Sequence, residues 1–208
     1  DPALSQDAID QLLRGEVKEG SGVEISVTRA EGGADFTVFI PFAVINVPSV
    51  TWRVLTEDER IGYVQVLRFT ARTPDELTTA FTDLRAANIT ALVLDLRNNT
   101  GGLLQESIQV ADQFIDTGAI VYQRDRNGER TFEGTSGGGM IDLPMLVLVN
   151  NMTASGAELV AGALRDSGRA ILIGQTTFGK GTVQQIFTLS DQSSMHITSA
   201  EWFTPSRQ

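Results

Sequence analysis

The sequence predicts an α/β fold built in layers, and three observations support this prediction. Residues 91–96 (ALVLDL) form a nearly continuous apolar run, which is typical of a strand covered on both faces in a parallel sheet. Strand-like and helix-like segments alternate from residue 50 onward, as expected for helices packed on a sheet. The chain has 208 residues, of which 41% are hydrophobic, so it can bury one substantial core.

The first 49 residues predict only a small module. Apolar residues at helical spacing indicate a helix over 5–14, which ends before Gly15. Alternating residues predict strands at 23–27 and 36–40, joined by a turn at 31–34. So short a segment rarely buries a core of its own, so it either packs on the rest of the chain or is the remnant of a larger module.

The remaining residues, 50–208, predict one larger domain. Strands are expected at 50–55, 61–69, 91–96, 119–123, 145–149 and 170–173, and helices at 73–88, 103–116 and 157–166. Residues 124–142, which include three consecutive glycines, are expected to form a polar loop. Residues 182–189 and 194–200 read as two β segments that form a C-terminal hairpin.

Composition excludes several classes of function. A net charge of −10 and a pI near 4.5 disfavour a general nucleic-acid or anionic-membrane surface. There is no cysteine, which removes thiolate catalysis, and a single histidine, which removes multi-histidine metal sites. That residue, His196, lies in a β segment and is interpreted as a packing or surface residue. The longest apolar stretch, 143–149, is far short of the ~20 residues that a membrane span needs, so no integral membrane segment is expected.

Three polar stretches come directly after predicted strands, where open α/β sheets place their ligands. Gly101 and Gly102 follow the strand at 91–96; they either form an ordinary turn or expose amides that bind an anion. Ser155 stands at the start of a predicted helix. With Glu158 it has the spacing of a helix capping box, yet a hydroxyl there also faces free amides that could stabilise an oxyanion.

Lys180 lies between glycines after the last strand of the sheet. It is either an ordinary solvated lysine or a desolvated amine whose lowered pKa would make it a general base.

Taken together, residues 92–104 (LVLDLRNNTGGLL), 153–164 (TASGAELVAGAL) and 177–184 (TFGKGTVQ) resemble the signatures of the carboxyl-terminal processing, or tail-specific, serine peptidases. The resemblance extends from about residue 50 to the end of the chain, and residues 5–49 resemble the closing part of the family's PDZ module. It implies a layered core like those of ClpP and crotonase, with a mixed sheet flanked by helices. Most of the PDZ module would then lie upstream of this chain, which we interpret as a fragment.

The resemblance also implies residue roles. Ser155 would be the nucleophile, Lys180 the general base, and Gln184 the residue that orients the lysine amine. The oxyanion hole would consist of the backbone amides of Gly101 and Gly156. A proline is common in the family where Thr100 stands, and a small residue such as alanine where Gly156 stands, so this loop is expected to be more flexible here.

The expected function is therefore endoproteolysis near protein C-termini through an acyl-enzyme, with unfolded or C-terminally tagged proteins as substrates and no metal or organic cofactor. Two alternatives stay open, a crotonase-like acyl hydrolase and a non-catalytic peptide-binding module. Family resemblance alone suggests an extracytoplasmic location, which is periplasmic, secreted or membrane-associated. The sequence leaves open whether the chain forms a homo-oligomer.

Overall fold

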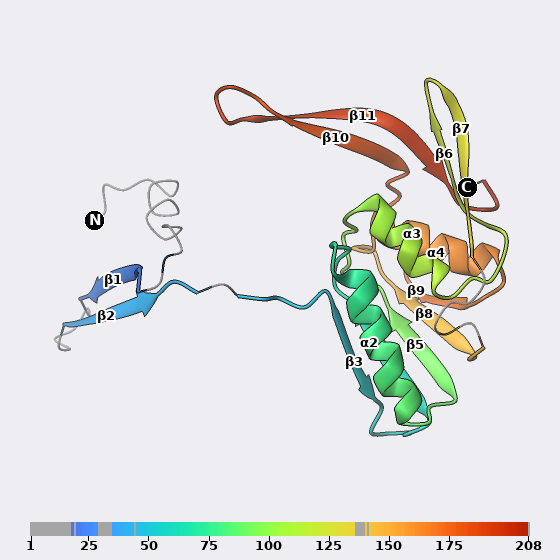
Figure 1. Ribbon diagram of the computed structural model, residues 1–208, viewed down its shortest axis with the longest axis horizontal. Coiled ribbons are helices and arrows are strands. Elements are labelled where there is room, and N and C mark those ends of the chain that lie inside the picture. The colour runs from blue at the N-terminus through green and yellow to red at the C-terminus, as the bar shows by residue number, and fades with distance from the viewer. Residues whose placement is uncertain are drawn as a thin grey trace. The chain divides into compact units, whose positions relative to one another are not determined.

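The computed structural model describes residues 18, 20–28, 35–43, 45–135, 140 and 142–207, and the chain divides into two compact units, 1–47 and 48–208. In the first unit β1 (Gly22–Val27) pairs antiparallel with β2 (Phe36–Pro41) (Figure 1). The helix expected over 5–14 and the turn expected at 31–34 lie outside the described residues. The assignment of this unit to a PDZ module stays a prediction.

A five-stranded sheet forms the centre of the second unit. Its strands are β3 (Val50–Val54), β4 (Ile61–Val66), β5 (Ala91–Asp95), β8 (Met145–Val149) and β9 (Ile171–Gly174), in the order β3-β4-β5-β8-β9. Only β3 runs antiparallel to its neighbour. The carboxyl ends of the four parallel strands therefore meet at one edge of the sheet, where the polar loops begin.

The second unit contains three helices within the described residues: α2 (Thr73–Ala86), α3 (Leu104–Asp112) and α4 (Gly156–Asp166). Helix α2 contacts β3 and β4, whereas α3 and α4 pack against each other (Figure 1). Helix α4 is buried without interruption from Gly156 to Leu164, so it lies inside the core and its first turn is firmly held. Each large apolar side chain buried in this way stabilises the fold by about 1.5–3 kcal/mol.

A second, antiparallel sheet has the order β10-β11-β6-β7. It consists of β6 (Ala119–Asp125), β7 (Gly128–Glu133), β10 (Thr182–Thr188) and β11 (Ser194–Phe203). Strand β11 pairs with β6 only at residues 201–203, while β10 pairs with β11 from residue 194 to residue 201. Most of the β10–β11 ribbon therefore extends beyond its neighbours in the sheet (Figure 1).

Two sequence predictions are wrong in detail. The polar loop expected over 124–142 contains strand β7, which pairs along its length with β6. The segment GERTFE lacks apolar alternation because only Phe132 packs on the core, so its strand character comes from pairing and from the turn at Gly128, where φ is +134°. The helix expected over 103–116 is shorter, ending at Asp112, and the buried Phe114 follows it in a turn.

Candidate active site

The loops after β5, β8 and β9 converge on a cleft of about 360 Å³ beside the base of the β10–β11 ribbon. Four of the five predicted site residues line it: Ser155, Gly156, Lys180 and Gln184. The rest of the lining is mainly apolar, and consists of Gly102, Leu103, Leu104, Leu159, Thr182, Val183, Ile186, His196 and Trp202. The fifth predicted residue, Gly101, is directly adjacent to Ser155, since a Cβ built on it would come within 2.9 Å of Ser155 Cβ.

Ser155 has a strained backbone. Its φ of 55° and ψ of −119° lie outside the regions that a non-glycine residue normally occupies. The residue stands on a sharp turn between β8 and α4, which presents its half-buried hydroxyl group to the cleft at the positive end of a buried helix. Strand–turn–helix elbows of this kind hold the nucleophile in α/β hydrolases.

Gly156 supplies an unoccupied amide. Its N–H belongs to the first turn of α4 and makes no hydrogen bond among the described residues. A Cβ here would collide with Ser107 Oγ on the adjacent helix α3, so a larger residue would force that hydroxyl away from Leu103 O, to which it donates at 2.9 Å. This amide is therefore available to a developing negative charge in the cleft.

The amide of Gly101 is already occupied in this structure. It donates to Asn99 Oδ1 at 2.8 Å, and the buried Asn99 side chain is itself held by a bond from Nδ2 to Val66 O at 2.8 Å. The Gly101 N–H can bind an oxyanion only after it leaves Asn99. The neighbouring Gly102 lines the cleft, and its N–H makes no hydrogen bond among the described residues. The sequence indicated exposed amides at this glycine pair, whereas the roles implied by the family resemblance include only Gly101.

Lys180 and Gln184 are joined by a hydrogen bond. Lys180 Nζ donates to Gln184 Oε1 at 3.4 Å, and the lysine is half-buried. No hydrogen bond joins Lys180 Nζ to Ser155 Oγ in the described part of the chain, although both residues line the cleft. In structures without substrate, catalytic hydrogen bonds are often long or poorly aligned, and they tighten only when substrate binds.

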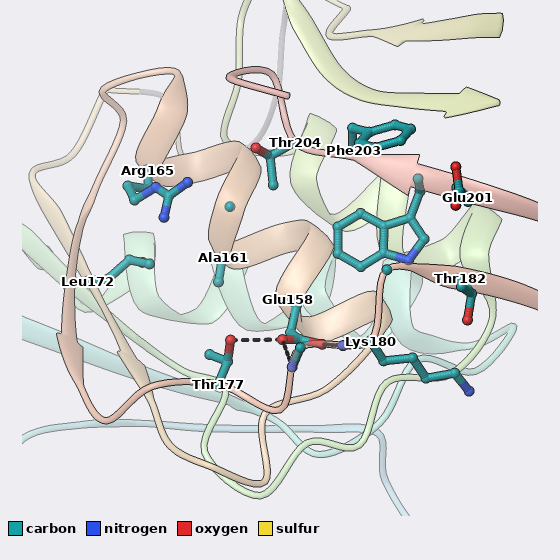
Figure 2. Close-up of a pocket in the computed structure, with 14 residues that line it drawn as sticks. Glu158, Ala161, Arg165, Leu172, Thr177, Lys180, Thr182, Glu201, Phe203 and Thr204 are labelled. Carbon is teal, nitrogen blue, oxygen red and sulfur yellow. Dashed lines mark hydrogen bonds between the residues drawn. The ribbon is translucent and has the colours of Figure 1, made fainter. Parts of the chain in front are cut away.

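A carboxylate not assigned to the site connects its two halves. Glu158 is 8% exposed; its Oε2 accepts from Ser155 N at 2.8 Å and Lys180 N at 2.9 Å, and its Oε1 from Gly179 N at 2.6 Å and Thr177 Oγ1 at 2.7 Å. Figure 2 shows the carboxylate between Thr177 and the chain that leads to Lys180. The capping-box spacing indicated only the bond to Ser155 N. The other three come from a loop 19 to 22 residues away, which no local pattern reveals.

The carboxylate also forms part of the lining of a second cavity of about 460 Å³, which shares Lys180, Thr182 and Trp202 with the cleft (Figure 2). Glu158 therefore fixes the turn that carries Ser155 and the loop that carries Lys180 to each other.

A second buried carboxylate fixes the loop that carries Gly101. Asp95, which is 1% exposed, accepts from Arg97 Nη2 at 2.6 Å and from Tyr63 Oη at 2.6 Å. Burial alone would raise the pKa of Asp95, but the hydrogen bonds from Arg97 and Tyr63 outweigh it and hold that pKa below its usual value. Burial and the bond to Asp95 together raise the pKa of Tyr63. Asp95 is therefore an ionised anchor for the turn after β5.

The turns after β5 and β8 are also bonded to each other. Asn150 Oδ1 accepts from Asn98 N at 2.9 Å, and Asn150 Nδ2 donates to Asn98 Oδ1 at 2.8 Å. The buried hydroxyl of Thr153 donates to Leu96 O at 2.9 Å. These bonds hold the glycine turn next to Ser155.

His196 lies in the same cleft as the predicted catalytic residues. It was expected to be a packing or surface residue, and it is exposed, but its position beside the site was not foreseen. The signal was the predicted hairpin itself, because strands joined by a short turn bring residue 196 back opposite residue 186.

Among the described residues there is no group of three or more His, Cys, Asp or Glu side chains arranged to hold a metal ion. The search for a helix long and apolar enough to cross a membrane, made over the same residues, also finds none.

Comparison with known proteins identifies close relatives. Residues 60–208 match the profile of peptidase family S41. The chain is 39% identical over 191 residues to the carboxyl-terminal-processing protease of Picosynechococcus sp., covering 90% of this chain and 46% of that protein. It is 36% identical over 203 residues to the chloroplastic carboxyl-terminal-processing peptidase 2 of Arabidopsis thaliana, covering 94% of this chain and 39% of the relative. The chain thus spans less than half the length of these two relatives.

Solved structures agree with the sequence matches. The photosystem II D1 C-terminal processing protease superposes with a TM-score of 0.69 at 34% identity, covering 83% of this chain and 48% of that one. A putative S41 protease from Bacteroides fragilis shares the fold, with a TM-score of 0.68 at 20% identity over 89% of this chain and 55% of that one.

Proposed function

We propose that this chain, which belongs to peptidase family S41, is the catalytic part of a serine endopeptidase that cleaves proteins near their C-termini. The observation that carries the proposal is that Ser155 and Lys180 line the same cleft, with Ser155 held on a strained turn. Several relatives are named as carboxyl-terminal processing proteases, which favours peptide hydrolysis over acyl-CoA chemistry or simple peptide binding.

In the proposed first step, Lys180 Nζ takes the proton of the Ser155 hydroxyl as Oγ bonds to the carbonyl carbon of the scissile peptide. Gln184 Oε1, 3.4 Å from Nζ, orients the amine. The carbonyl oxygen becomes an oxyanion, and the Gly156 N–H stabilises it together with the Gly101 N–H, which must first leave Asn99. Losing one such donor typically costs 10²–10³ in rate, about 3–4 kcal/mol.

In the second half of the reaction, the C–N bond breaks and Lys180 returns its proton to the leaving amine. This leaves an ester between Ser155 Oγ and the N-terminal part of the substrate. Water, deprotonated by Lys180, then attacks the ester carbon. The bond from that carbon to Ser155 Oγ breaks, and Lys180 returns the proton to Oγ. Every proton transfer passes through one amine, so the mechanism uses no histidine.

The substrates we propose are unfolded or C-terminally tagged proteins, because an extended chain can enter the cleft beside β10. Homo-oligomer formation is compatible with the proposal and is not required by it. We also propose that the chain acts outside the cytoplasm. The support for that location comes from its relatives, three of which are named as chloroplastic enzymes.

The test is digestion of casein between pH 7 and 9 by the unaltered chain, Ser155→Ala and Lys180→Ala. We expect each substitution to reduce cleavage by at least about 10³-fold. Two matched controls should keep full activity: Ser167→Ala, at the far end of α4, and Lys18→Ala, the only other lysine. Cleavage that survives in Ser155→Ala or Lys180→Ala, with the fold intact, would overturn the proposed dyad.

A further inference from the structure

The cleft has an unusual charge for this protein. The chain carries 26 acidic residues and a net charge of −10, yet none of the residues that line the cleft is acidic. Its two basic side chains are Lys180 and His196, the only histidine of the chain. Lys180 has a place in the proposed reaction, whereas His196 has none.

The register of the ribbon shows which residues share a face with His196. Directly opposed residues in an antiparallel pair point to the same side, and every second residue along a strand does so too. Gln184 pairs with Thr198, and Ile186 pairs with His196. Gln184, Ile186 and His196 therefore lie on one face of the ribbon, which continues outward from Lys180.

No acidic side chain of the ribbon is placed to pair with His196 on this face. Strand β10 contains no charged residue, and the only acid in β11 is Glu201, which is paired with Arg124 at 2.8 Å. Asp191, in the turn between the strands, accepts hydrogen bonds from Ser193 N and Oγ. His196 Nε2 lies 3.3 Å from Ser194 Oγ, and the other ring nitrogen makes no hydrogen bond among the described residues.

We propose that His196 is a specificity-determining residue that binds a carboxylate of the substrate, with the neighbouring Ile186 contacting the aliphatic part of the same side chain. Ile186 is 64% exposed and stands directly opposite His196, so the two form an apolar surface beside a cationic or donor group. Glutamate, with two methylenes and a carboxylate, matches that pair. This inference rests on the proposed peptidase function.

The position of the subsite can be derived from strand geometry. His196 and Ile186 lie two residue pairs beyond Gln184, which is about 7 Å along the strand. An extended substrate advances by about the same distance in two residues. His196 therefore meets the substrate two residues from the position next to Gln184.

The test measures binding, so that it does not depend on turnover. Fluorescein-labelled ten-residue peptides, built otherwise from uncharged residues, carry one glutamate, glutamine or lysine at one of six central positions. Each peptide ends in either a free carboxylate or an amide. Their Kd values are measured by fluorescence anisotropy with Ser155→Ala, Ser155→Ala/His196→Gln and Ser155→Ala/His196→Glu. The control is Ser155→Ala/Met195→Gln, because Met195 is exposed on the opposite face of the same strand.

We expect glutamate to bind about 2- to 5-fold more tightly than glutamine at one position, typical of a partly exposed charged contact. His196→Gln should abolish this preference, His196→Glu should shift it to lysine, and Met195→Gln should leave it unchanged. If only the free C-terminus is preferred to the amide, and His196→Gln removes that preference, the carboxylate is the terminal one.

The inference is overturned if no peptide binds, if glutamate and glutamine bind equally at every position and the two C-terminal forms do too, or if His196→Gln leaves the preference unchanged. The casein assay tests the peptidase proposal separately from the proposed role of His196. Cleavage that depends on Ser155 without a carboxylate preference would overturn only the role of His196. A preference that depends on His196 in a chain without hydrolysis would overturn only the peptidase.

Discussion

Replacing Glu158 by glutamine should loosen the candidate active site without changing its shape. The carboxylate accepts four hydrogen bonds, and all four partners are donors: the amides of Ser155, Gly179 and Lys180 and the hydroxyl of Thr177. A glutamine has one acceptor oxygen, and its NH₂ group must face two of these donors.

The structure allows the cost to be worked out. The least costly placement directs the NH₂ toward Thr177, whose hydroxyl can turn to accept, so that only Gly179 N–H loses its acceptor. One unsatisfied buried donor costs about 1–3 kcal/mol, and the bonds that remain lose the strength contributed by the charge. We therefore expect Glu158→Gln to lower the free energy of unfolding by about 2–4 kcal/mol.

Urea unfolding gives that free energy, and casein hydrolysis gives the activity. Since Glu158 holds the turn of Ser155 against the loop of Lys180, activity should fall at least about 100-fold under conditions where the variant is still folded. Thr177→Val removes only one of the four bonds and should cost about 1 kcal/mol. As a control, Glu201→Gln alters a 54%-exposed carboxylate in a surface ion pair and should cost no more than about 1 kcal/mol. A Glu158→Gln variant with unchanged stability and full activity would refute this reasoning.

Two further predictions concern the packing and the ionisation of α4. Gly156→Ala should destabilise the protein by about 1–3 kcal/mol, because the new methyl group meets Ser107 Oγ; Ser107→Ala in the same chain should restore stability, and additive unfolding free energies would contradict the contact. At Asp166, burial raises the pKa, but hydrogen bonds from Arg165, Ser206 and Thr204 outweigh it and lower the pKa from 3.8 to about 2. Since the folded pKa lies below the unfolded one, Asp166 contributes about 2 kcal/mol of stability above pH 4, which is lost as the pH falls through 2. Asp166→Asn should therefore be less stable at pH 7 and lose less stability on acidification to pH 2, as followed by urea unfolding; equal losses in both proteins would contradict this.

The elements that bury apolar residues were predictable from the sequence. Strands β5 and β8 and helix α4 begin or end within a residue of their expected bounds, because continuous apolar runs and the glycine and proline punctuation around them reflect the core directly. Strand β7 was missed since it packs only Phe132 on the core and otherwise depends on pairing with β6.

The site was predictable only in part, for a related reason. Ser155, Lys180 and Gln184 stand out through motifs, and they lie in one cleft. The bonds that hold them there join distant segments: Glu158 to residues 177–180, Asp95 to Tyr63, and Asn98 to Asn150. The hydrogen bond from Gly101 N–H to Asn99 Oδ1 joins residues close in sequence. It depends on a φ of +98° at Gly101, which the sequence alone does not specify.

Covalent labelling tests the proposed activation of Ser155 by Lys180 most directly. An alkyl fluorophosphonate forms a bond from phosphorus to an activated serine oxygen and releases fluoride, so it requires no peptide substrate. Mass spectrometry of the digested protein should place the label on Ser155, and Lys180→Ala should slow the labelling by at least about 100-fold while Lys18→Ala has no effect. Labelling at another residue, or labelling of Ser155 at an unchanged rate in Lys180→Ala, would contradict the account.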